Sequence, residues 1–274
     1  MAVVTLSREL GSLGTEVADM LASRLGFARL DKESLEALLS GLGMSGPQFE
    51  RNDEKPPGFW QQFSLQRVRY IDFMKAAMYR FAGEKDCVII GRGAHVIFRG
   101  VPGVLRLRFI APLKARAARV HERFHVDEQQ ALRMIHQSDR DRAAYHRYFF
   151  NEAWDAPSEY DLVVNTGSIT PAEAVETVAE LLRSPVFTTS AERARAALRD
   201  LRIAQDVIVA IAYRERLAVM QLDVTCDRGV VTLEGTVQSQ PPADRCAVVA
   251  SGVDGVTRVV NNVVVMEYPA YPGV

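Results

Sequence analysis

The stretch VVTLSRELGSLGTEVADML, residues 3–21, decides the fold. It begins with a β-branched run typical of a strand, continues through a turn that contains Gly11 and Gly14, and ends in apolar residues at helical spacing. A turn between a first strand and a first helix is where α/β proteins bind phosphate, because the helix N-terminus presents free amides and a partial positive charge there. The stretch therefore predicts an α/β domain, and its spacing leaves both phosphate binding and a plain tight turn open for the loop.

The next segments alternate between the same two patterns. Continuous apolar runs, typical of strands in a sheet covered on both faces, are separated by amphipathic runs. The predicted strands cover residues 86–93, 104–111 and 160–166, and the predicted helices cover residues 15–26, 32–42, 63–82, 112–124 and 171–184. The segment between about Gly41 and Phe59 is polar and rich in proline and glycine, so it predicts an exposed loop. Strands that alternate with helices predict a doubly wound, mostly parallel sheet with helices on both faces.

The pattern changes after Ser184. A helix is predicted from about Ala191 to Arg216, and alternating Val, Thr and Leu residues then flank Asp227-Arg228-Gly229, which is a hairpin signal. Another helix and strand complete a small αββαβ domain. The chain is therefore expected to comprise a first domain, a linker and a second domain at residues 1–185, 186–197 and 198–268.

The composition is that of an ordinary globular protein. The 274 residues carry a formal charge of -1, which gives no reason to expect nucleic acid as a partner. The N-terminal residues contain no apolar stretch long enough for a signal peptide or a membrane span, so we expect a cytoplasmic protein without a membrane role. The cysteines are odd in number and widely spaced, which favours buried thiols over disulfides or a metal site: Cys87, Cys226 and Cys246.

The stretch HERFH, from His121 to His125, matches the H-E-x-x-H pattern of zinc peptidases, and Glu152 would be available as a third ligand. Zinc binding requires both histidines on one unbroken helix. The D-x-x-Q pattern that starts at Asp127 is typical of a capping box, which would begin a new helix and leave His125 in the break before it. The neighbouring arginines would also repel a cation. The sequence therefore favours solvated histidines at a helix corner, with no metal site.

Several spaced motifs in the first part of the chain resemble one family. They are SRELGSLGTEVADMLASRLGFARLDKE from Ser7, CVIIGRGAHVIF from Cys87, APLKARAARVHERF from Ala111, DRDRAAYHRYF from Asp139 and YDLVVNT from Tyr160. In this order they are similar to the cytidylate kinase-like family over nearly all of the first 185 residues. The resemblance implies a nucleoside monophosphate kinase fold of the P-loop-kinase type.

The family resemblance also implies a site. It consists of ATP with Mg²⁺ at the glycine loop, a monophosphate under a helical insertion, and an arginine-rich lid. The residues that match the phosphate loop are Gly11, Ser12, Gly14 and Thr15. The residues expected to bind the acceptor are Asp31, Arg92, Arg116 and Asp139. Because phosphoryl transfer needs mainly positive charge and alignment, Arg8, Arg119 and Arg142 are the expected catalytic residues.

Two parts of a P-loop kinase are missing from the sequence. Gly14 stands where the pattern G-x-x-x-x-G-K-[ST] has its lysine, and Arg8 stands where it has its first glycine. Gly93 replaces the aspartate of cytidylate kinase's G-R-D motif. Losing one such group could lower the rate by about a hundred- to a thousand-fold. Arg8 could replace the lysine, and Glu9 or Asp31 could orient a water on Mg²⁺.

The C-terminal segment resembles the BON domain from about Leu198 to Met266. The matching residues are Gly229, Gly235, Gly255, Val256 and Asn261. The family is associated with phospholipid surfaces and envelope proteins, but the segment has no basic cluster. We therefore expect a protein partner or self-association through this domain.

The sequence predicts an ATP-dependent kinase that transfers the γ-phosphate to a cytidine-type monophosphate or a related small acceptor. The alternative is a catalytically inactive nucleotide-binding regulator that acts through the BON domain, and a scaffold without a ligand comes third. Base choice would depend on the segment between Gly41 and Arg69, which carries no informative pattern. Removing everything after about Ser190 is expected to leave nucleotide binding unchanged.

Overall fold

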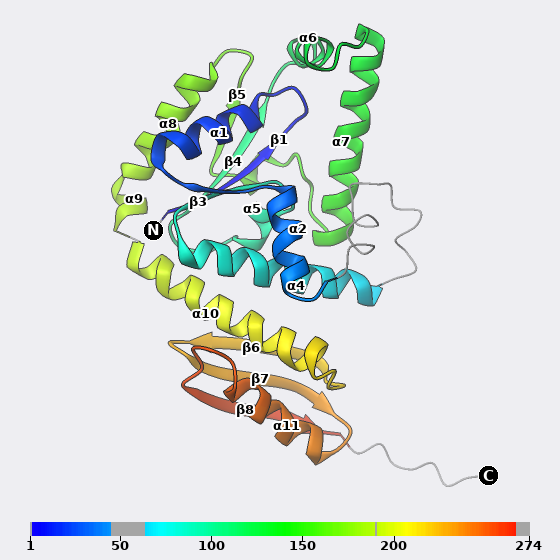
Figure 1. The fold of residues 1–274 in the computed structure, drawn as a ribbon, viewed down its shortest axis with the longest axis vertical. Helices are drawn as coiled ribbons and strands as arrows, with labels where there is room; N and C mark the ends of the chain where they lie inside the picture. Colours follow the sequence, from blue (N-terminus) through cyan, green and yellow to red (C-terminus); the bar gives the residue numbers. More distant parts are fainter. Residues whose placement is uncertain (1, 45–63, 190, 267–274) are drawn as a thin grey trace, which may run out of the picture. The chain divides into compact units, whose positions relative to one another are not determined.

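The computed structural model describes residues 2–44, 64–189 and 191–266 (Figure 1). The chain divides into two compact units. The first comprises Met1–Arg67 and Glu84–Arg195, and the second comprises Val68–Gly83 and Ala196–Val274. Each unit has its own sheet and its own core.

The first unit is built on a five-stranded parallel sheet in the order β2-β3-β1-β4-β5. The strands are β1 (Val3–Arg8), β2 (Ala28–Leu30), β3 (Cys87–Ile90), β4 (Val104–Ile110) and β5 (Leu162–Asn165). The predicted parallel α/β sheet is therefore confirmed. The three-residue strand β2 was missed because it is too short to display a period.

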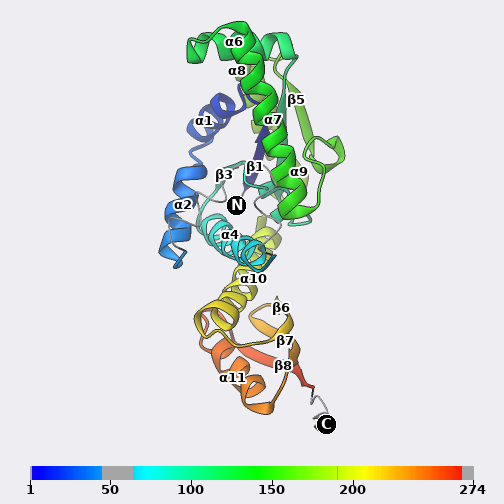
Figure 2. The same ribbon diagram turned by 90° about the vertical axis from the view of Figure 1, so that its right-hand side faces the viewer.

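Helices cover both faces of this sheet, and Figure 2 shows α1 on one side of it and α7 (Glu128–Phe150) on the other. The helices α1 (Gly14–Leu25) and α8 (Pro171–Arg183) pack on one face, where Val17, Leu21 and Val178 join Leu6 and the alternating apolar residues of the strands in one buried core. The helix α7 and the segment after it cover the other face, where residues such as Ser7 point.

The remaining helices of the first unit lie at the carboxyl ends of the strands or connect them. They are α2 (Lys32–Gly41), α5 (Ala94–Ile97), α6 (Leu113–Phe124) and the 3-10 turn η2 (Pro157–Glu159). The short helix α9 (Pro185–Thr188) follows α8. The helix α4 (Ser64–Glu84) precedes β3, as predicted. Most of the loop predicted between Gly41 and Phe59 lies outside the described residues.

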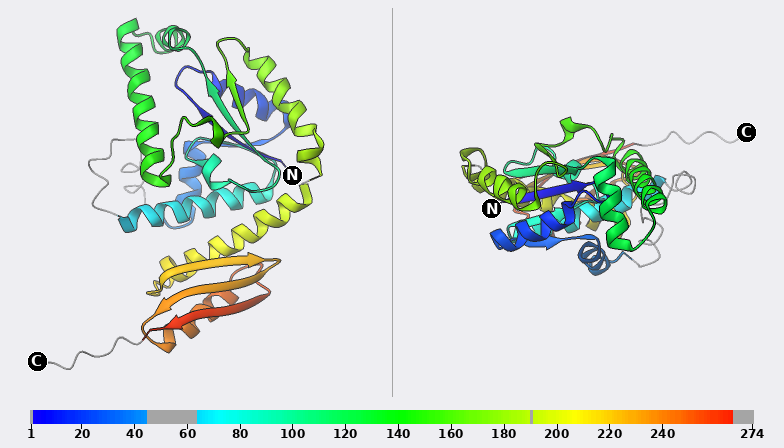
Figure 3. Two further views of the ribbon diagram at one scale, coloured as in Figure 1. Left: turned by 180° about the vertical axis from the view of Figure 1, so that it is seen from behind. Right: turned by 90° about the horizontal axis from the view of Figure 1, so that it is seen from above.

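The second unit has the predicted αββαβ order. The helix α10 (Ala191–Val209) continues as a π-helical turn, η3 (Ala210–Arg214), and is followed by β6 (Met220–Asp227), β7 (Val230–Val237), α11 (Gln240–Ser251) and β8 (Arg258–Val265). The strands lie side by side in the order β6-β7-β8 (Figure 3), with β6 antiparallel and β8 parallel to β7. Ile203, Val207 and Ile211 pack on Val231 and Leu233 to form its core.

The second unit also contains most of α4, which the sequence did not indicate. Asp72 of α4 accepts hydrogen bonds from the hydroxyl of Tyr213 at 2.6 Å and from the amide of Gln205 at 3.2 Å. Arg80 of α4 forms an ion pair with the buried Asp206 at 2.8 Å. The predicted linker, residues 186–197, is mostly helical, since α9 ends at Thr188 and α10 begins at Ala191. The predicted domain limits stay predictions.

Within the described ranges, no helix is both long enough and apolar enough to cross a bilayer.

Candidate functional site

The loop between β1 and α1 is folded tightly around its two glycines. Gly11 has φ +79°, and a Cβ atom there would lie 2.8 Å from the carbonyl oxygen of Arg116. A Cβ atom on Gly14 would lie 2.6 Å from Cβ of Arg8. Between them, Leu13 adopts the left-handed conformation directly before α1 begins. Close packing therefore requires both glycines, and at Gly11 the backbone conformation requires one as well.

Three successive carbonyl groups of the loop are held by the elements behind it. Arg116 donates from Nε to the Leu10 oxygen at 2.7 Å, Arg119 donates from Nη1 to the Gly11 oxygen at 3.0 Å, and Thr166 donates from its hydroxyl to the Ser12 oxygen at 2.8 Å. These bonds fix the direction in which the carbonyls point.

The Ser12 amide donates to the Glu9 carbonyl at 3.3 Å, but other amides of the same loop have no such partner among the described residues. Within the described part of the chain, no acceptor is found for the amides of Gly11, Leu13, Gly14 and Thr15. The first amides of a helix have no acceptor inside the helix, and they carry the positive end of its dipole. A loop with anchored carbonyls and available amides is a site for an anion.

A cavity of about 570 Å³ lies against this loop. It is lined by Arg8, Glu9, Leu10, Gly11, Leu13, Gly14, Thr15, Glu16, Arg119, Val120, Glu122, Arg123, Phe124 and Arg142. Its size is within the range of small-molecule sites. The structure thus brings together the loop and all of the predicted catalytic arginines.

Arg8 crosses the end of the neighbouring strand β3. A Cβ atom on Gly91, which has φ +73°, would lie 2.6 Å from Nη1 of Arg8. The guanidinium of Arg8 therefore lies beside the carboxyl end of β3 and lines the loop cavity from there. Arg8 thus provides a positive charge between the glycine loop and the end of β3.

Arg116 and Arg119 are largely occupied by the protein itself. Arg116 is buried and also binds Asp139 of α7 through both carboxylate oxygens, at 2.8 and 2.9 Å. Arg119 donates to the Thr166 carbonyl at 2.7 Å and to its hydroxyl at 3.1 Å. The structure thus brings Arg116 and Asp139 together, but as a contact between α6 and α7 that also supports the loop.

The other residues predicted on the acceptor side do not line the loop cavity. Asp31 caps α2 by accepting from the Ser34 amide, and it forms an ion pair with Arg29. Burial alone would raise the pKa of Asp31, but the hydrogen bonds from Ser34 and Arg29 lower it to about 2. Arg92 is buried in the left-handed conformation, 3.8 Å from Glu36.

The ring of Phe150 fills the space beside the residue after Arg92. Gly93 has φ +71°, and a Cβ atom there would overlap the Phe150 ring at the end of α7. Any side chain at position 93, where the G-R-D motif has its aspartate, would therefore need an unfavourable backbone conformation and would clash with Phe150.

Two of the three carboxylates that line the cavity are engaged by other groups of the protein, whereas no partner is found for the third, Glu122, among the described residues. Glu9 accepts from the Ala111 amide at 3.2 Å and lies 3.3 Å from Nη1 of Arg116, while Glu16 forms an ion pair with Arg123 at 3.0 Å. No cluster of three His, Cys, Asp or Glu side chains suited to a metal occurs in the described ranges. Mg²⁺ in kinases is usually held by one or two carboxylates and the substrate phosphates. The loop fits a polyphosphate, whereas the carboxylates do not provide a dedicated metal site.

A buried cluster on the far face of the sheet was not indicated by the sequence. Arg108 stacks on Trp154 with 4.2 Å between guanidinium carbon and ring centroid, and Trp154 donates to Ser7 at 2.9 Å. The rings of His95 and His146 lie 5.0 Å apart in the same cluster. Burial, followed by nearby positive charge, lowers the pKa of His146 to about 3. The sequence contained one sign of this cluster, which is that Ser7 and Arg108 are polar residues within otherwise apolar strands.

The HERFH stretch forms a corner, as predicted. The helix α6 ends at Phe124, His125 has φ +55°, and α7 begins after Asp127, whose side chain accepts from the Gln130 amide. His121 contacts the carbonyl of Val126. Because the two histidines do not share a helix, the geometry of a zinc peptidase is absent here.

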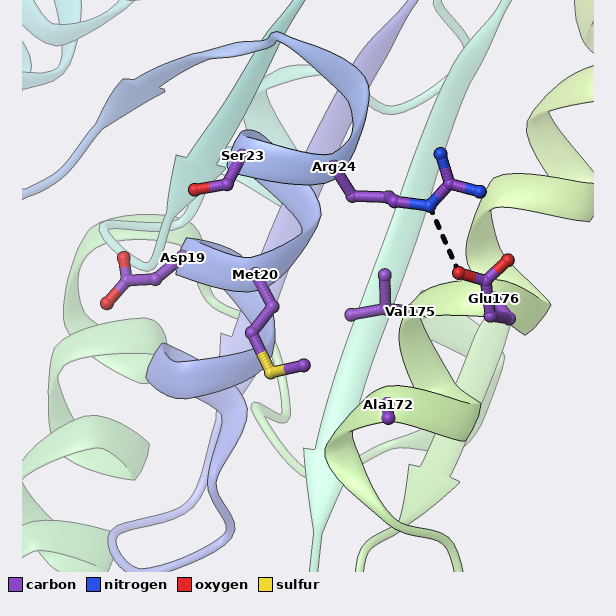
Figure 4. A pocket seen from close by; sticks show the side chains of 7 residues that line it. All are labelled: Asp19, Met20, Ser23, Arg24, Ala172, Val175 and Glu176. Atoms are coloured by element: carbon purple, nitrogen blue, oxygen red, sulfur yellow. Dashed lines mark hydrogen bonds and ion pairs between the residues drawn. The ribbon is translucent and has the colours of Figure 1, made fainter.

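A second hollow, of about 470 Å³, lies between α1 and α8 and is shown in Figure 4. Its lining includes Met20, Val175 and an ion pair at 3.1 Å between Arg24 and Glu176. In the part of the chain that the structure describes, no glycine loop borders it, and Arg24 is the one cationic side chain in its lining, so the loop cavity remains the candidate site.

A model of the cytidylate kinase-like family matches residues 3–168, and a model of the BON domain matches residues 199–267. The chain belongs to the cytidylate kinase-like family. The kinase-like fold of this family agrees with the parallel sheet and the glycine loop of the first unit. The second unit of the chain contains the BON domain.

Similar solved structures cover the cytidylate kinase-like part. An uncharacterized protein from Eubacterium ventriosum is 22% identical with a TM-score of 0.52, and the match covers 67% of this chain and 99% of that one. Shikimate kinase from Bacteroides thetaiotaomicron is 14% identical with a TM-score of 0.42, over 67% of this chain and 99% of that one.

A local sequence match to a curated protein also exists. Uronate isomerase of Corynebacterium glutamicum is 36% identical over 95 residues, which are 34% of this chain and 18% of the isomerase. The match thus spans less than a fifth of that protein.

Proposed function

We propose that the cytidylate kinase-like domain binds the phosphates of ATP at the β1–α1 loop and transfers the γ-phosphate to a nucleoside monophosphate or a related small acceptor. An acceptor oxygen would form a bond to the γ-phosphorus while the bond to the β–γ bridging oxygen breaks, and ADP leaves with that electron pair. Two observations carry the proposal: three loop carbonyls are anchored, and the amides of Gly11, Leu13, Gly14 and Thr15 have no acceptor among the described residues, so they can bind an anion.

The arginines divide into two groups in this proposal. Arg8 and Arg142 line the cavity and stabilise negative charge on the transferred group, with Arg8 in the role of the missing lysine. Arg119 and Arg116 act as positioning residues, because their guanidinium groups hold the loop from behind. Arg92 and Asp31 remain candidates for the acceptor side.

Mg²⁺ bound to the triphosphate would neutralise phosphate charge. Thr15 lines the cavity and stands where the P-loop pattern has its Ser or Thr, so its hydroxyl is the protein group proposed to contact the ion. No carboxylate is assigned to that role. The residues of this chain are therefore proposed to bind and orient the polyphosphate.

A nucleotide-binding regulator that acts through the BON domain is the second candidate. It is favoured by the occupied carboxylates Glu9 and Glu16 and by Phe150, which closes the position of the missing aspartate. Such a protein would bind ATP through the same loop but would not turn it over.

The test is calorimetric titration of the full chain with ATP, with and without Mg²⁺, and then with CMP and AMP, followed by a nucleoside diphosphate assay on the same samples. Saturable ATP binding with formation of a diphosphate supports the kinase. Saturable binding without product supports the regulator. An absence of binding to any nucleotide would refute both.

A further inference from the structure

The outer rim of the loop cavity is formed by the end of α6. Phe124, the last residue of this helix, lines the cavity and is 44% exposed. No other aromatic residue in the described ranges is exposed to this degree. A single exposed apolar side chain is common on protein surfaces. What distinguishes Phe124 is that its ring borders the same cavity as the phosphate-binding loop.

Arg123 lies next to this ring and is held differently from the other arginines of α6. Its guanidinium carbon is 5.6 Å from the Phe124 ring centroid, and its Nη1 atom forms an ion pair with Glu16 at 3.0 Å. The side chains of this pair are 60% and 42% exposed. An exposed pair of this kind stabilises a protein by at most about 1 kcal/mol, so it exchanges partners readily. Arg119, by contrast, makes bonds to Gly11 and Thr166 that the loop depends on.

An aromatic ring and an exchangeable cation therefore line the same cavity as a loop of available amides. Nucleotides present a flat base and a polyphosphate, which are the two groups that such a rim recognises. Glu16 and Glu122 also line the cavity, and their negative charges oppose the binding of a phosphate.

We propose that Phe124 is the surface on which the base of the bound nucleoside triphosphate stacks, and that Arg123 exchanges its ion pair with Glu16 for one with the phosphates. This inference rests on the proposed function and extends it to the class of donor. Every nucleobase has a stacking face, so a phenyl ring does not select among bases. The donor site would accept purine and pyrimidine nucleoside triphosphates with similar affinity.

The experiment measures the affinity of the full chain for ATP, GTP, CTP and inorganic tripolyphosphate by calorimetry. Phe124→Ala should weaken binding of all three nucleotides by about fivefold to a hundredfold and leave tripolyphosphate binding unchanged, because only nucleotides have a base to stack. Phe124→Tyr should bind like the wild type. Glu16→Gln should strengthen binding of all four ligands by about two- to fivefold, since it releases Arg123 and removes a negative charge.

Leu113→Ala is the matched control, because Leu113 is an exposed apolar residue at the other end of α6 and does not line the cavity. It should bind all four ligands like the wild type. Equal weakening of nucleotide and tripolyphosphate binding in Phe124→Ala, or no weakening, would overturn the stacking role. Weaker binding in Glu16→Gln would overturn the exchange by Arg123. If the wild-type chain binds no ligand, the proposed function itself fails, and that failure appears before any variant is compared.

Discussion

At the scale of single residues, the loop depends on side chains that bind the protein's own backbone. A guanidinium group has five donors in a fixed fork, so Arg116 and Arg119 can each satisfy several oxygen acceptors at once. The sequence indicated that these residues carry positive charge near a phosphate loop. It could not indicate that their hydrogen bonds point at Leu10, Gly11 and Thr166, because those partners are more than forty residues away in the chain.

The glycines of the loop provide a test of its shape. Gly11→Ala would place a methyl group 2.8 Å from the Arg116 carbonyl at a positive φ, so the loop must shift. We expect at least a tenfold loss of ATP affinity by calorimetry, because the loop amides would no longer converge.

Gly26→Ala is the matched control, since Gly26 also has a positive φ but open space around it. The control should lose about 1 kcal/mol of stability and keep its ATP affinity. Equal ATP affinities in the two variants would contradict the role of the loop.

The two buried histidines predict how stability depends on pH. Burial, followed by positive charge nearby, lowers the pKa of His95 to about 2 and that of His146 to about 3. In the unfolded chain both imidazoles have ordinary values near 6.5. As pH falls below about 6.5, the unfolded chain therefore binds protons that the folded chain does not. The free energy of unfolding should decrease by at most about 1.4 kcal/mol per pH unit for each histidine until pH approaches 3.

Urea denaturation between pH 7.5 and 4.5 measures this effect. His146→Phe, which keeps a ring in the cluster with Trp154, should show a shallower decrease of the free energy of unfolding as pH falls. His136→Gln, at an exposed position of α7, should follow the wild type. Identical slopes for wild type and His146→Phe would show that His146 does not contribute.

At the scale of elements, α7 contacts the site at several points along its length. It is a 23-residue helix that begins at the Asp127 cap, contacts Arg116 through Asp139 and ends with Phe150 against Gly93. The capping pattern in the sequence correctly predicted where it begins. Its end against Gly93 depends on packing between residues far apart in the chain, which no local pattern records.

The closure of Gly93 by α7 can be tested with the residue that the G-R-D motif would have there. Gly93→Asp should destabilise the protein by more than about 2 kcal/mol, because φ is positive and the Phe150 ring occupies the space. It should not increase diphosphate formation. Gly100→Asp is the control, with a positive φ and open surroundings. Denaturation midpoints that match for the two variants would show that Phe150 does not block the position.

At the scale of the whole molecule, the chain is not divided where the sequence patterns change. The family match includes α4, but residues 68–83 of this helix belong to the second compact unit. Phe73 packs near the ring of Tyr213, with 5.3 Å between centroids, and Asp72 and Arg80 add polar contacts to the same unit. A chain cut at Ser190 keeps α4 but loses Tyr213, so the truncation is expected to lower stability, and the unchanged nucleotide binding expected of it stays a prediction.

A single polar contact tests this second unit. Asp72→Asn keeps the shape of the side chain but replaces one of two acceptor oxygens by a donor, opposite the Tyr213 hydroxyl and the Gln205 amide. Because the group is largely buried, we expect a loss of about 1 to 3 kcal/mol in the free energy of unfolding. Asp244→Asn, in the exposed helix-surface pair with Gln240, should cost less than about 0.5 kcal/mol. A similar cost for both changes would mean that the α4 contact contributes little.

The sequence by itself determined the order of the strands and helices apart from β2, the parallel sheet, the glycine loop before α1, the helix break at Asp127 and the αββαβ order of the second unit. These features depend on local period, capping and turn residues, which act over a few positions. Only the tertiary structure decided which way the loop carbonyls point, why Gly93 has no room for an acid, and that α4 packs with the second unit. Each of these depends on contacts between residues far apart in the chain, and such contacts leave no period in the sequence.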